Sequence, residues 1–271
     1  MSGHTVGTPP SRYVIRGGEV GRDRLRVLSG VLEVSTAALL DRVGIPRDAM
    51  CLDIGCGGGD VTALLAARAP TGRVVGTDRD AVKIDLARIG SAPNVEFRVE
   101  DIADTIASGT RYDVVYARFL LSHLPDAAGW VGALAELVAP GGALVVEDVR
   151  ISGTFCSPPS AAFERALDIF IRTVRANGGD PELGPHLPRY LQAAGLDGIG
   201  IEVVQPAGLT GDAKRIQVLT LSTVRDAAVA AGVADEDEIN RLVGALGAFA
   251  GRDDTVVSTA QIVQTWGYRR V

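Results

Sequence analysis

The chain has 271 residues, a formal net charge of −6 and three cysteines. This length suits one α/β domain of generous size, or one domain with a small cap. The negative charge gives no electrostatic basis for binding nucleic acid or an anionic membrane, and an odd, low cysteine count argues against a disulfide framework. No apolar run approaches the roughly 20 residues needed to span a bilayer. Residues 1–10 are polar and lack the apolar part of a signal peptide. These features predict a soluble, cytoplasmic protein.

The first 44 residues predict a loop-like arm followed by a helix. Pro9-Pro10 and Gly17-Gly18 break regular structure, so residues 1–18 are expected to be a loop. From Glu19 to Val43, apolar residues recur at helical spacing opposite an Arg-rich side, which is typical of an amphipathic helix. Gly44 and Pro46 end that helix.

The middle of the chain alternates strands and helices. Strands are expected at 49–54, 72–77, 95–99, 112–117 and 143–147, and helices at 60–68, 80–89 and 128–138, with a turn at 140–142. This alternation predicts an α/β fold, in which a doubly wound, mostly parallel sheet carries helices on both faces.

After Asp148 the pattern becomes mostly helical. A loop is expected at 151–159, helices at 160–176, 187–194, 213–231 and 236–249, and strands at 200–205 and 262–266, with a helical or loop-like stretch from 256. We see no linker or repeat, so residues 1–271 are predicted to form a single domain. Its core is about 45–150, its N-terminal arm and helix 1–44, and its acceptor-side cap about 151–250.

The strongest functional signal is residues 52–60, LDIGCGGGD. A buried strand runs into glycines and then a helix, so a ligand can approach the backbone closely and reach free N–H groups. A dinucleotide loop has the pattern G-x-G-x-x-G, but here Asp60 stands at the third glycine, where a carboxylate would repel a pyrophosphate. Asp53 also fits a cationic ligand better than a phosphate.

This segment resembles the first motif of the class I SAM-dependent methyltransferases. Further motifs follow in order at Gly76-Thr77-Asp78, Glu100-Asp101-Ile102, and residues 112–118, 121–126 and 137–144. The resemblance covers about residues 47–150. It implies a Rossmann-like fold, with a seven-stranded, mostly parallel sheet whose last strand is antiparallel.

The resemblance also implies a set of cofactor contacts. Asp78 would hold both ribose hydroxyls in a charge-assisted, bidentate contact, and the acid after the third strand would take the adenine amino group. Tyr13 belongs to a segment that looks like the cofactor-covering arm of small-molecule methyltransferases, although it could instead simply pack against the first helix. The residues expected to bind S-adenosylmethionine, or the product S-adenosylhomocysteine, are Tyr13, Asp53, Gly55, Cys56, Gly57, Asp78, Arg79, Asp101, Ile102, Ala117, Arg118 and His123.

Other features bear on the acceptor. Residues 117–120, ARFL, replace the Asp-Pro-Pro-Tyr type segment of enzymes that methylate amino groups of bases or glutamine. Arg118 also occupies the place of the first metal-binding acid in the catechol type, so no metal is expected. His123 and His186 are the candidate general bases, although His123 could instead pack or cap the following helix. Glu147 and Asp148 end a strand, where one could face the acceptor or both could be solvated turn acids.

The function predicted from these motifs is methyl transfer to an O, N or C atom of a small molecule, in secondary metabolism. Neither nucleic acid nor a membrane is an expected partner. The sequence does not determine the oligomeric state, and a homo-oligomer is possible. The alternatives are a protein or nucleic-acid methyltransferase and a non-catalytic SAM- or nucleotide-binding protein. A dehydrogenase is disfavoured by the missing third glycine.

Overall fold

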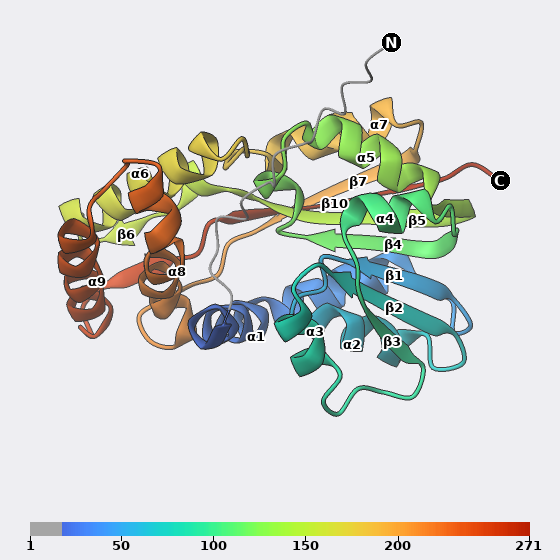
Figure 1. The fold of residues 1–271 in the computed structure, drawn as a ribbon, viewed down its shortest axis with the longest axis horizontal. Coiled ribbons are helices and arrows are strands. Elements are labelled where there is room, and N and C mark those ends of the chain that lie inside the picture. The colour runs from blue at the N-terminus through green and yellow to red at the C-terminus, as the bar shows by residue number, and fades with distance from the viewer. Residues whose placement is uncertain (1–17) are drawn as a thin grey trace, which may run out of the picture.

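The computed structural model describes residues 18–271. Tyr13 and the rest of the predicted arm lie outside the described residues. The predicted N-terminal helix is present as α1 (Gly18–Val43). Its first half lies beside a group of helices and its second half lies beneath a large sheet (Figure 1).

The large sheet has seven strands in the order β3-β2-β1-β4-β5-β10-β7. The strands are β1 (Met50–Ile54), β2 (Arg73–Asp78), β3 (Val95–Val99), β4 (Tyr112–Arg118), β5 (Val138–Arg150), β7 (Asp197–Val204) and β10 (Gln261–Tyr268). Strands β1 to β5 pair in parallel, whereas β10 runs antiparallel to both β5 and β7. The predicted fold class, with its antiparallel last strand, is therefore confirmed.

Helices cover both faces of this sheet, so neighbouring residues of one strand enter different cores. Cys51 of β1 packs on the side of α1 and α2 (Asp60–Arg68). Leu52 packs on the side of α5 (Ala127–Glu136) and α7 (Leu187–Ala193). Helix α3 (Ala81–Ala87) packs against Phe97 of β3. Burial on both faces explains the nearly continuous apolar character of the parallel strands.

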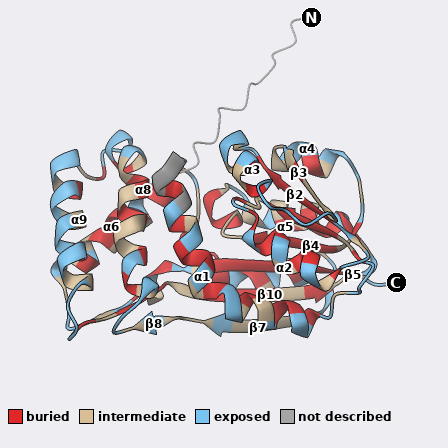
Figure 2. Cartoon of the chain, turned by 90° about the horizontal axis from the view of Figure 1, so that it is seen from below, coloured by how far each residue is buried: buried red, intermediate tan, exposed pale blue. Residues whose placement is uncertain are grey.

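A cap of helices lies beside the large sheet (Figures 1 and 2). It consists of α6 (Ala161–Ala176), α8 (Ile216–Ala230), α9 (Glu236–Ala250) and a small sheet of β6 (Cys156–Ser157), β9 (Val256–Ser258) and β8 (Ala207–Gly208). Helix α8 packs against α1, α6 and α9. Ser160 and Asp235 begin α6 and α9, because their side chains accept hydrogen bonds from backbone N–H groups of the first turn.

Several details differ from the sequence predictions, among them the short strands β6, inside the predicted loop 151–159, and β8. Residues 256–258 form β9 rather than a helical or loop-like stretch, and the turn predicted at 140–142 lies inside β5. There, Gly141 donates to the carbonyl of Arg269 and Gly142 accepts from its N–H, so pairing with the chain end extends the strand. The short helix α4 (Ile102–Ala107) was not predicted.

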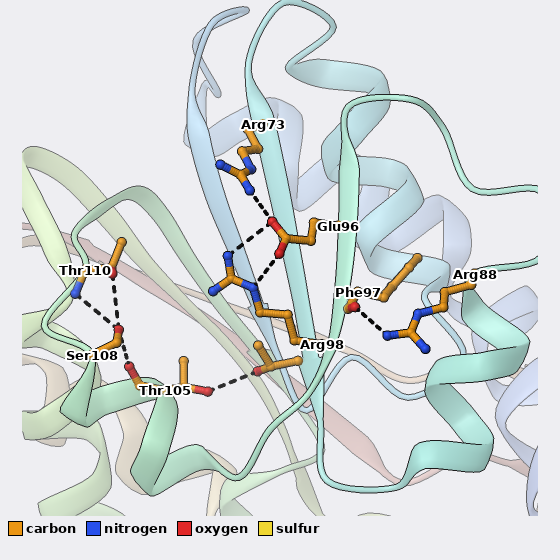
Figure 3. A network of polar contacts seen from close by, with 9 residues as sticks. Arg73, Arg88, Glu96, Phe97, Arg98, Thr105, Ser108 and Thr110 are labelled. Carbon is orange, nitrogen blue, oxygen red and sulfur yellow. Dashed lines mark hydrogen bonds and ion pairs between the residues drawn. The ribbon is translucent and has the colours of Figure 1, made fainter.

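Polar contacts fix the outer edge of the sheet next to α4 (Figure 3). On the edge strand β3, Glu96 accepts hydrogen bonds from Arg98 and Arg73. These bonds hold the pKa of Glu96 at about 2. Thr105 of α4 lies 3.5 Å, oxygen to oxygen, from Thr77 at the end of β2. Charged side chains protect the edge from pairing with another strand, and the Thr105–Thr77 contact places α4 beside the strand ends.

Candidate active site

A cleft of about 890 Å³ lies at the carboxyl ends of β1, β2, β3 and β4. Strand order reverses here, because β2 lies on one side of β1 and β4 on the other. Open α/β sheets bind ligands at such a switch point. The cleft is lined by the β1–α2 loop, the residues after β2, β3 and β4, and Arg24, Leu25 and Leu28 of α1.

The glycine loop is held at the floor of this cleft by backbone hydrogen bonds. Gly55 and Cys56 both donate to the carbonyl of Thr77, at 2.8 and 2.9 Å. Gly57 has φ +55°, and a Cβ there would meet only Leu25 Cδ1, at 3.5 Å. Gly59 has φ +83°, and a Cβ there would lie 2.7 Å from the ring of Phe97. Gly59 therefore allows close packing, whereas Gly57 presents its backbone to the cleft.

Asp78, at the end of β2, connects the loop to the cleft wall. Its Oδ2 accepts from Gly57 N at 3.1 Å and its Oδ1 accepts from Asp80 N at 2.9 Å. Lys83 Nζ lies 3.9 Å from Oδ2. The carboxylate is thus fixed, with acceptor capacity left at the cleft surface.

Asp53 lies beneath the loop and is 2% exposed. Thr62 donates to its Oδ2 at 2.6 Å. Burial raises the pKa of Asp53 to about 6, although the hydrogen bond from Thr62 and the charge of Arg118 oppose the shift. Burial and the nearby acids raise the pKa of the Cys56 thiol well above its ordinary range. Near neutral pH the thiol therefore stays protonated, whereas Asp53 is mostly ionised.

The two acids after β3 have different surroundings. Asp101 caps α4, because its Oδ1 accepts from Ala103 N at 3.1 Å. Oε2 of Glu100 is buried and accepts no hydrogen bond from any described residue. A buried acceptor without a donor is costly, so Glu100 marks the place where a ligand donor fits. The sequence motif contains both acids, but only Asp101 was selected as a contact.

Arg118 lies in the cleft wall between the sheet and α1. Its Nη2 donates to Ser29 at 2.9 Å and its Nη1 lies 3.3 Å from Thr36 Oγ1. Ala117 is 1% exposed and does not line the cleft, because it is packed in the core beside its strand partner Ile54. The structure therefore brings Arg118 to the cleft and not Ala117.

His123 lines the cleft from the single turn Leu121–His123, and it is 8% exposed. Burial and the charges of Arg24 and Lys83 lower the pKa of His123 to about 3. The imidazole is thus neutral near neutral pH and a weak base. Phe119, just before this turn, has φ +52°, a strained value for a bulky residue.

The other sequence candidates lie away from the cleft. His186 is exposed at the start of α7, where its ring lies 6.2 Å from that of Tyr190, and it lines neither this cleft nor the cavity beside it. Glu147 and Asp148 are fully buried and line neither cavity, so they are neither acceptor-facing nor solvated. Glu147 accepts hydrogen bonds from Thr36, Tyr116 and Gln264.

Of the expected cofactor residues, ten lie together in the lining: Asp53, Gly55, Cys56, Gly57, Asp78, Arg79, Asp101, Ile102, Arg118 and His123. Arg24, Leu28, Lys83 and Phe119 also line the cleft and were not predicted. Arg24 and Leu28 are four residues apart on α1, so they share a helix face, but this spacing alone does not distinguish a site from a core. Lys83 gave no sequence signal.

Comparisons with known proteins agree with this architecture. A family model described as a methyltransferase domain matches residues 32–197. A trans-aconitate 2-methyltransferase of Methylobacterium radiotolerans is 34% identical over 164 residues, which are 58% of each chain. Methyltransferase str2 of Strobilurus tenacellus is 29% identical over 187 residues, 67% of this chain and 66% of its own. The chain spans about half the length of the curated relatives it matches first, at 42% and 58%.

Solved structures show the same fold. A putative methyltransferase of Bacillus halodurans matches with a TM-score of 0.55 and 16% identity over 87% of this chain and 98% of its own. A phosphoethanolamine N-methyltransferase 2 of Haemonchus contortus, in complex with S-adenosyl-L-methionine, matches with a TM-score of 0.53 and 15% identity over 90% and 56%. The family-model match over residues 32–197 shows that the chain belongs to the methyltransferase family, and these structures share its class I, Rossmann-like fold.

Residues 18–271 contain neither a membrane-spanning helix nor a cluster of metal-ligating side chains. None of their helices is both long enough and apolar enough to cross a membrane. Within the same range, His, Cys, Asp and Glu side chains form no group of three or more that could hold a metal ion.

Proposed function

We propose that the protein transfers a methyl group from S-adenosylmethionine to a small-molecule acceptor. The observation that carries this proposal is the set of carboxylates around the glycine loop. Asp53, Asp78 and Glu100 line the same cleft at the carboxyl ends of the strands. Glu100 has a buried oxygen, Oε2, that accepts no hydrogen bond from any described residue. A cofactor with hydroxyl, amino and cationic groups fits such a site, and a pyrophosphate does not.

Each part of the cleft has a proposed role in holding this cofactor. Asp78 accepts from the ribose hydroxyls, and Glu100 and Asp101 face the adenine, with Arg79 and Ile102 beside it. The backbone of Gly55, Cys56 and Gly57 follows the methionine part. Asp53, mostly ionised near neutral pH, attracts its cationic groups, and Arg118 attracts its carboxylate. This assignment is supported by the presence of all these residues in one lining.

When bound, S-adenosylmethionine supplies a methyl group on a sulfonium centre, which is already an activated leaving group. The chain's residues therefore need mainly to align an acceptor atom and to exclude water. Arg24, Leu28, Phe119 and His123 lie where the cleft meets a neighbouring cavity, so we place the acceptor there. We assign His123 to this wall rather than to general-base catalysis, because its pKa is about 3. No role is proposed for the exposed His186.

Calorimetric titration with S-adenosylmethionine, S-adenosylhomocysteine and NADH tests the proposal. We expect the first two to bind and NADH not to bind. Binding of NADH alone would overturn the cofactor assignment and point to hydride transfer. Tight binding of S-adenosylmethionine without turnover of any acceptor would favour the alternative of a non-catalytic binding protein. A role in secondary metabolism and a cytoplasmic location stay predictions from the sequence.

A small-molecule acceptor is preferred to a protein or nucleic acid for two reasons. The net charge is −6, which disfavours a polyanion. In addition, α1 and the cap helices α6 and α8 contribute side chains to the walls of the cavity where the acceptor is placed. A concave site with such walls suits a small molecule.

A further inference from the structure

A second cavity adjoins the cleft between the cap and the ends of β5 and β10. The two cavities share the lining residues Arg24, Leu28, Phe119 and His123. The second cavity has a volume of about 60 Å³, which is room for only a few water molecules. We call it the acceptor pocket. In this conformation it accommodates only a small part of an organic molecule.

The walls of the acceptor pocket are mostly apolar. Helix α6 contributes Leu167, Phe170 and Val174, and Ile216 of α8 and Ile262 of β10 face them. Phe170 and Val174 belong to the buried core of the cap, so these walls are well packed rather than loose surface. An apolar group gains free energy on entering such a pocket, whereas a polar group without partners loses it.

The described residues of the pocket lining include one side chain with a formal charge. Among the described residues that line it, only Arg24 is charged at neutral pH, and no carboxylate lines it. Arg24 is 9% exposed, and its Nε lies 3.0 Å from Thr220 Oγ1. A guanidinium keeps its charge in proteins. The pocket therefore favours an anionic group at Arg24 and disfavours an ammonium group.

The weak basicity of His123 favours an acceptor that is already an anion in water. Since the pKa of His123 is about 3, it is poorly suited to remove a proton from an alcohol or a phenol. An acceptor that is already ionised in water needs no such base. Carboxylic acids ionise near pH 4, so a carboxylate arrives ready to react.

We propose that the methyl acceptor is a short, apolar monocarboxylic acid, which places its apolar end in the acceptor pocket and its carboxylate beside Arg24. This inference rests on the proposed function. A carboxylate oxygen forms the new O–CH₃ bond as the S–CH₃ bond breaks, and the electron pair of that bond goes to sulfur. A carboxylate and a sulfonium thus become a neutral methyl ester and a thioether, and no proton is transferred.

The proposed acceptor differs from trans-aconitate, the substrate that the names of the similar trans-aconitate 2-methyltransferases give. Trans-aconitate has three carboxylates, whereas the part of the pocket lining that the structure describes contains one cationic side chain, Arg24. Two further carboxylates would be buried without a counter-charge, which is strongly unfavourable. We therefore expect this chain to select against a tricarboxylate.

A matched acceptor series tests the inference. Hexanoate, hexylamine and hexan-1-ol share one apolar body, butyrate, octanoate and benzoate vary its size and shape, and trans-aconitate tests charge. With S-adenosylmethionine present, we expect methyl esters of the monocarboxylates by mass spectrometry, no methylated amine or alcohol, and kcat/KM at least 100-fold lower for trans-aconitate. A preference for the amine, the alcohol or trans-aconitate overturns the inference.

Binding of acceptors to the complex with S-adenosylhomocysteine tests the acceptor inference separately from the proposed cofactor site. We expect the monocarboxylates to raise the melting temperature of that complex. If the complex forms but no monocarboxylate stabilises it or is methylated, this inference is wrong while the proposed cofactor site stands. If S-adenosylhomocysteine does not bind, the proposed function itself fails.

Variants of α1 test the anchor. Arg24→Met should raise KM for the best monocarboxylate at least tenfold, Arg24→Lys should keep most of the affinity, and the exposed Arg26→Met should behave as the unchanged protein. Leu167→Ala should shift the preference toward a longer chain. Since Arg24 also lines the cleft, affinity for S-adenosylhomocysteine is measured for each variant. An unchanged KM in Arg24→Met, or an equal loss of cofactor affinity, overturns the role of Arg24 as acceptor anchor.

Discussion

At the scale of single residues, Asp78 is the side chain on which the proposed cofactor contact most depends. Asp78→Asn keeps the shape but loses the charge that two ribose hydroxyls would use. We expect affinity for S-adenosylhomocysteine to fall by about 1.5–3 kcal/mol, the scale of hydrogen bonds to a charged group. Titration calorimetry measures this change. Asp85→Asn is the control, because Asp85 lies on the same helix as Lys83 but is exposed beside Arg88.

Asp78 also accepts bonds from Gly57 and Asp80, so a folding defect must be separated from a binding defect. Circular dichroism and the melting temperature of the ligand-free variant provide that check. A folded Asp78→Asn variant with unchanged affinity would contradict the ribose assignment.

Asp148 gives a prediction about pH. It is fully buried, its Oδ2 accepts from Ser122 N at 3.0 Å, and burial raises its pKa to about 6. The folded state therefore binds a proton more readily than the unfolded state. Its stabilising contribution is complete below the unfolded pKa of about 3.9 and is lost as pH rises through about 6. Asp148→Asn should remove this loss.

The measured quantity is the difference in unfolding free energy between Asp148→Asn and the unchanged protein. From pH 4 to pH 8 it should shift in favour of the variant by up to about 3 kcal/mol, since each pKa unit corresponds to about 1.4 kcal/mol. Asp53, whose pKa is also about 6, titrates in both proteins and cancels in the difference. A difference that does not vary with pH would show that Asp148 has an ordinary pKa.

Site residues predicted from ordered sequence motifs lie in the cleft more often than residues predicted from their amino-acid type alone. Asp78 and Gly57 follow strands in a fixed order, so the sequence locates them once the strands are recognised. His186 was chosen because histidine often acts as a base, and nothing in its neighbours indicated its exposure. Arg24 reaches the cleft only because α1 packs beside it, which is a tertiary contact that local sequence does not encode.

At the scale of elements, the β1–α2 loop gives a paired glycine test. Gly59 and Gly90 both have positive φ, +83° and +73°. Alanine in that region costs about 1–2 kcal/mol at either site. At Gly59 the added Cβ also meets Phe97 at 2.7 Å, whereas at Gly90 nothing lies within 4 Å. We therefore expect Gly59→Ala to lose clearly more unfolding free energy than Gly90→Ala in urea.

If the two alanine variants are equally stable, Phe97 moves aside without cost and close packing does not explain Gly59. Phe97 also packs against α3, so a larger loss in Gly59→Ala should come with weaker cofactor binding through displacement of the loop.

Long helices could be predicted from the sequence, whereas very short strands could not. Long helices such as α6 and α9 have clear apolar periodicity and capping residues, and their predicted ends differ from the structure by one residue at most. The strands β6, β8 and β9 have only two or three residues each. Alternation cannot be recognised over so short a span. Their pairing is also long-range, because β9 pairs with β6, about a hundred residues earlier, and with β8, about fifty residues earlier.

At the scale of the whole molecule, α1 joins the cap to the core. Toward its beginning, Leu28 and Leu32 pack with Ile216 of α8 and with Ile262 of β10. Toward its end, Leu39 and Leu40 pack with α2 beneath the sheet. The sequence predicted the helix and its apolar spacing, but not that the same helix would form a wall of both cavities. That role depends on how the cap docks against the sheet.

Leu32→Ala tests this connection. Leu32 is fully buried, and truncation of such a leucine costs about 2–5 kcal/mol. We expect a lower melting temperature and also weaker binding of S-adenosylhomocysteine, because Leu28 and Arg24, one and two turns earlier, line the cleft. Val34→Ala on the same helix is the control, since Val34 is 83% exposed. Differential scanning calorimetry with and without S-adenosylhomocysteine measures both effects.

The comparison is made with ligand in excess, because a ligand at 100 times its dissociation constant stabilises the folded state by about 2.7 kcal/mol. If α1 couples the cap to the cleft, Leu32→Ala should show a smaller ligand-induced rise in melting temperature than Val34→Ala at the same ligand concentration. An equal rise in both variants, with only Leu32→Ala less stable, would mean that α1 supports the fold without shaping the cofactor cleft.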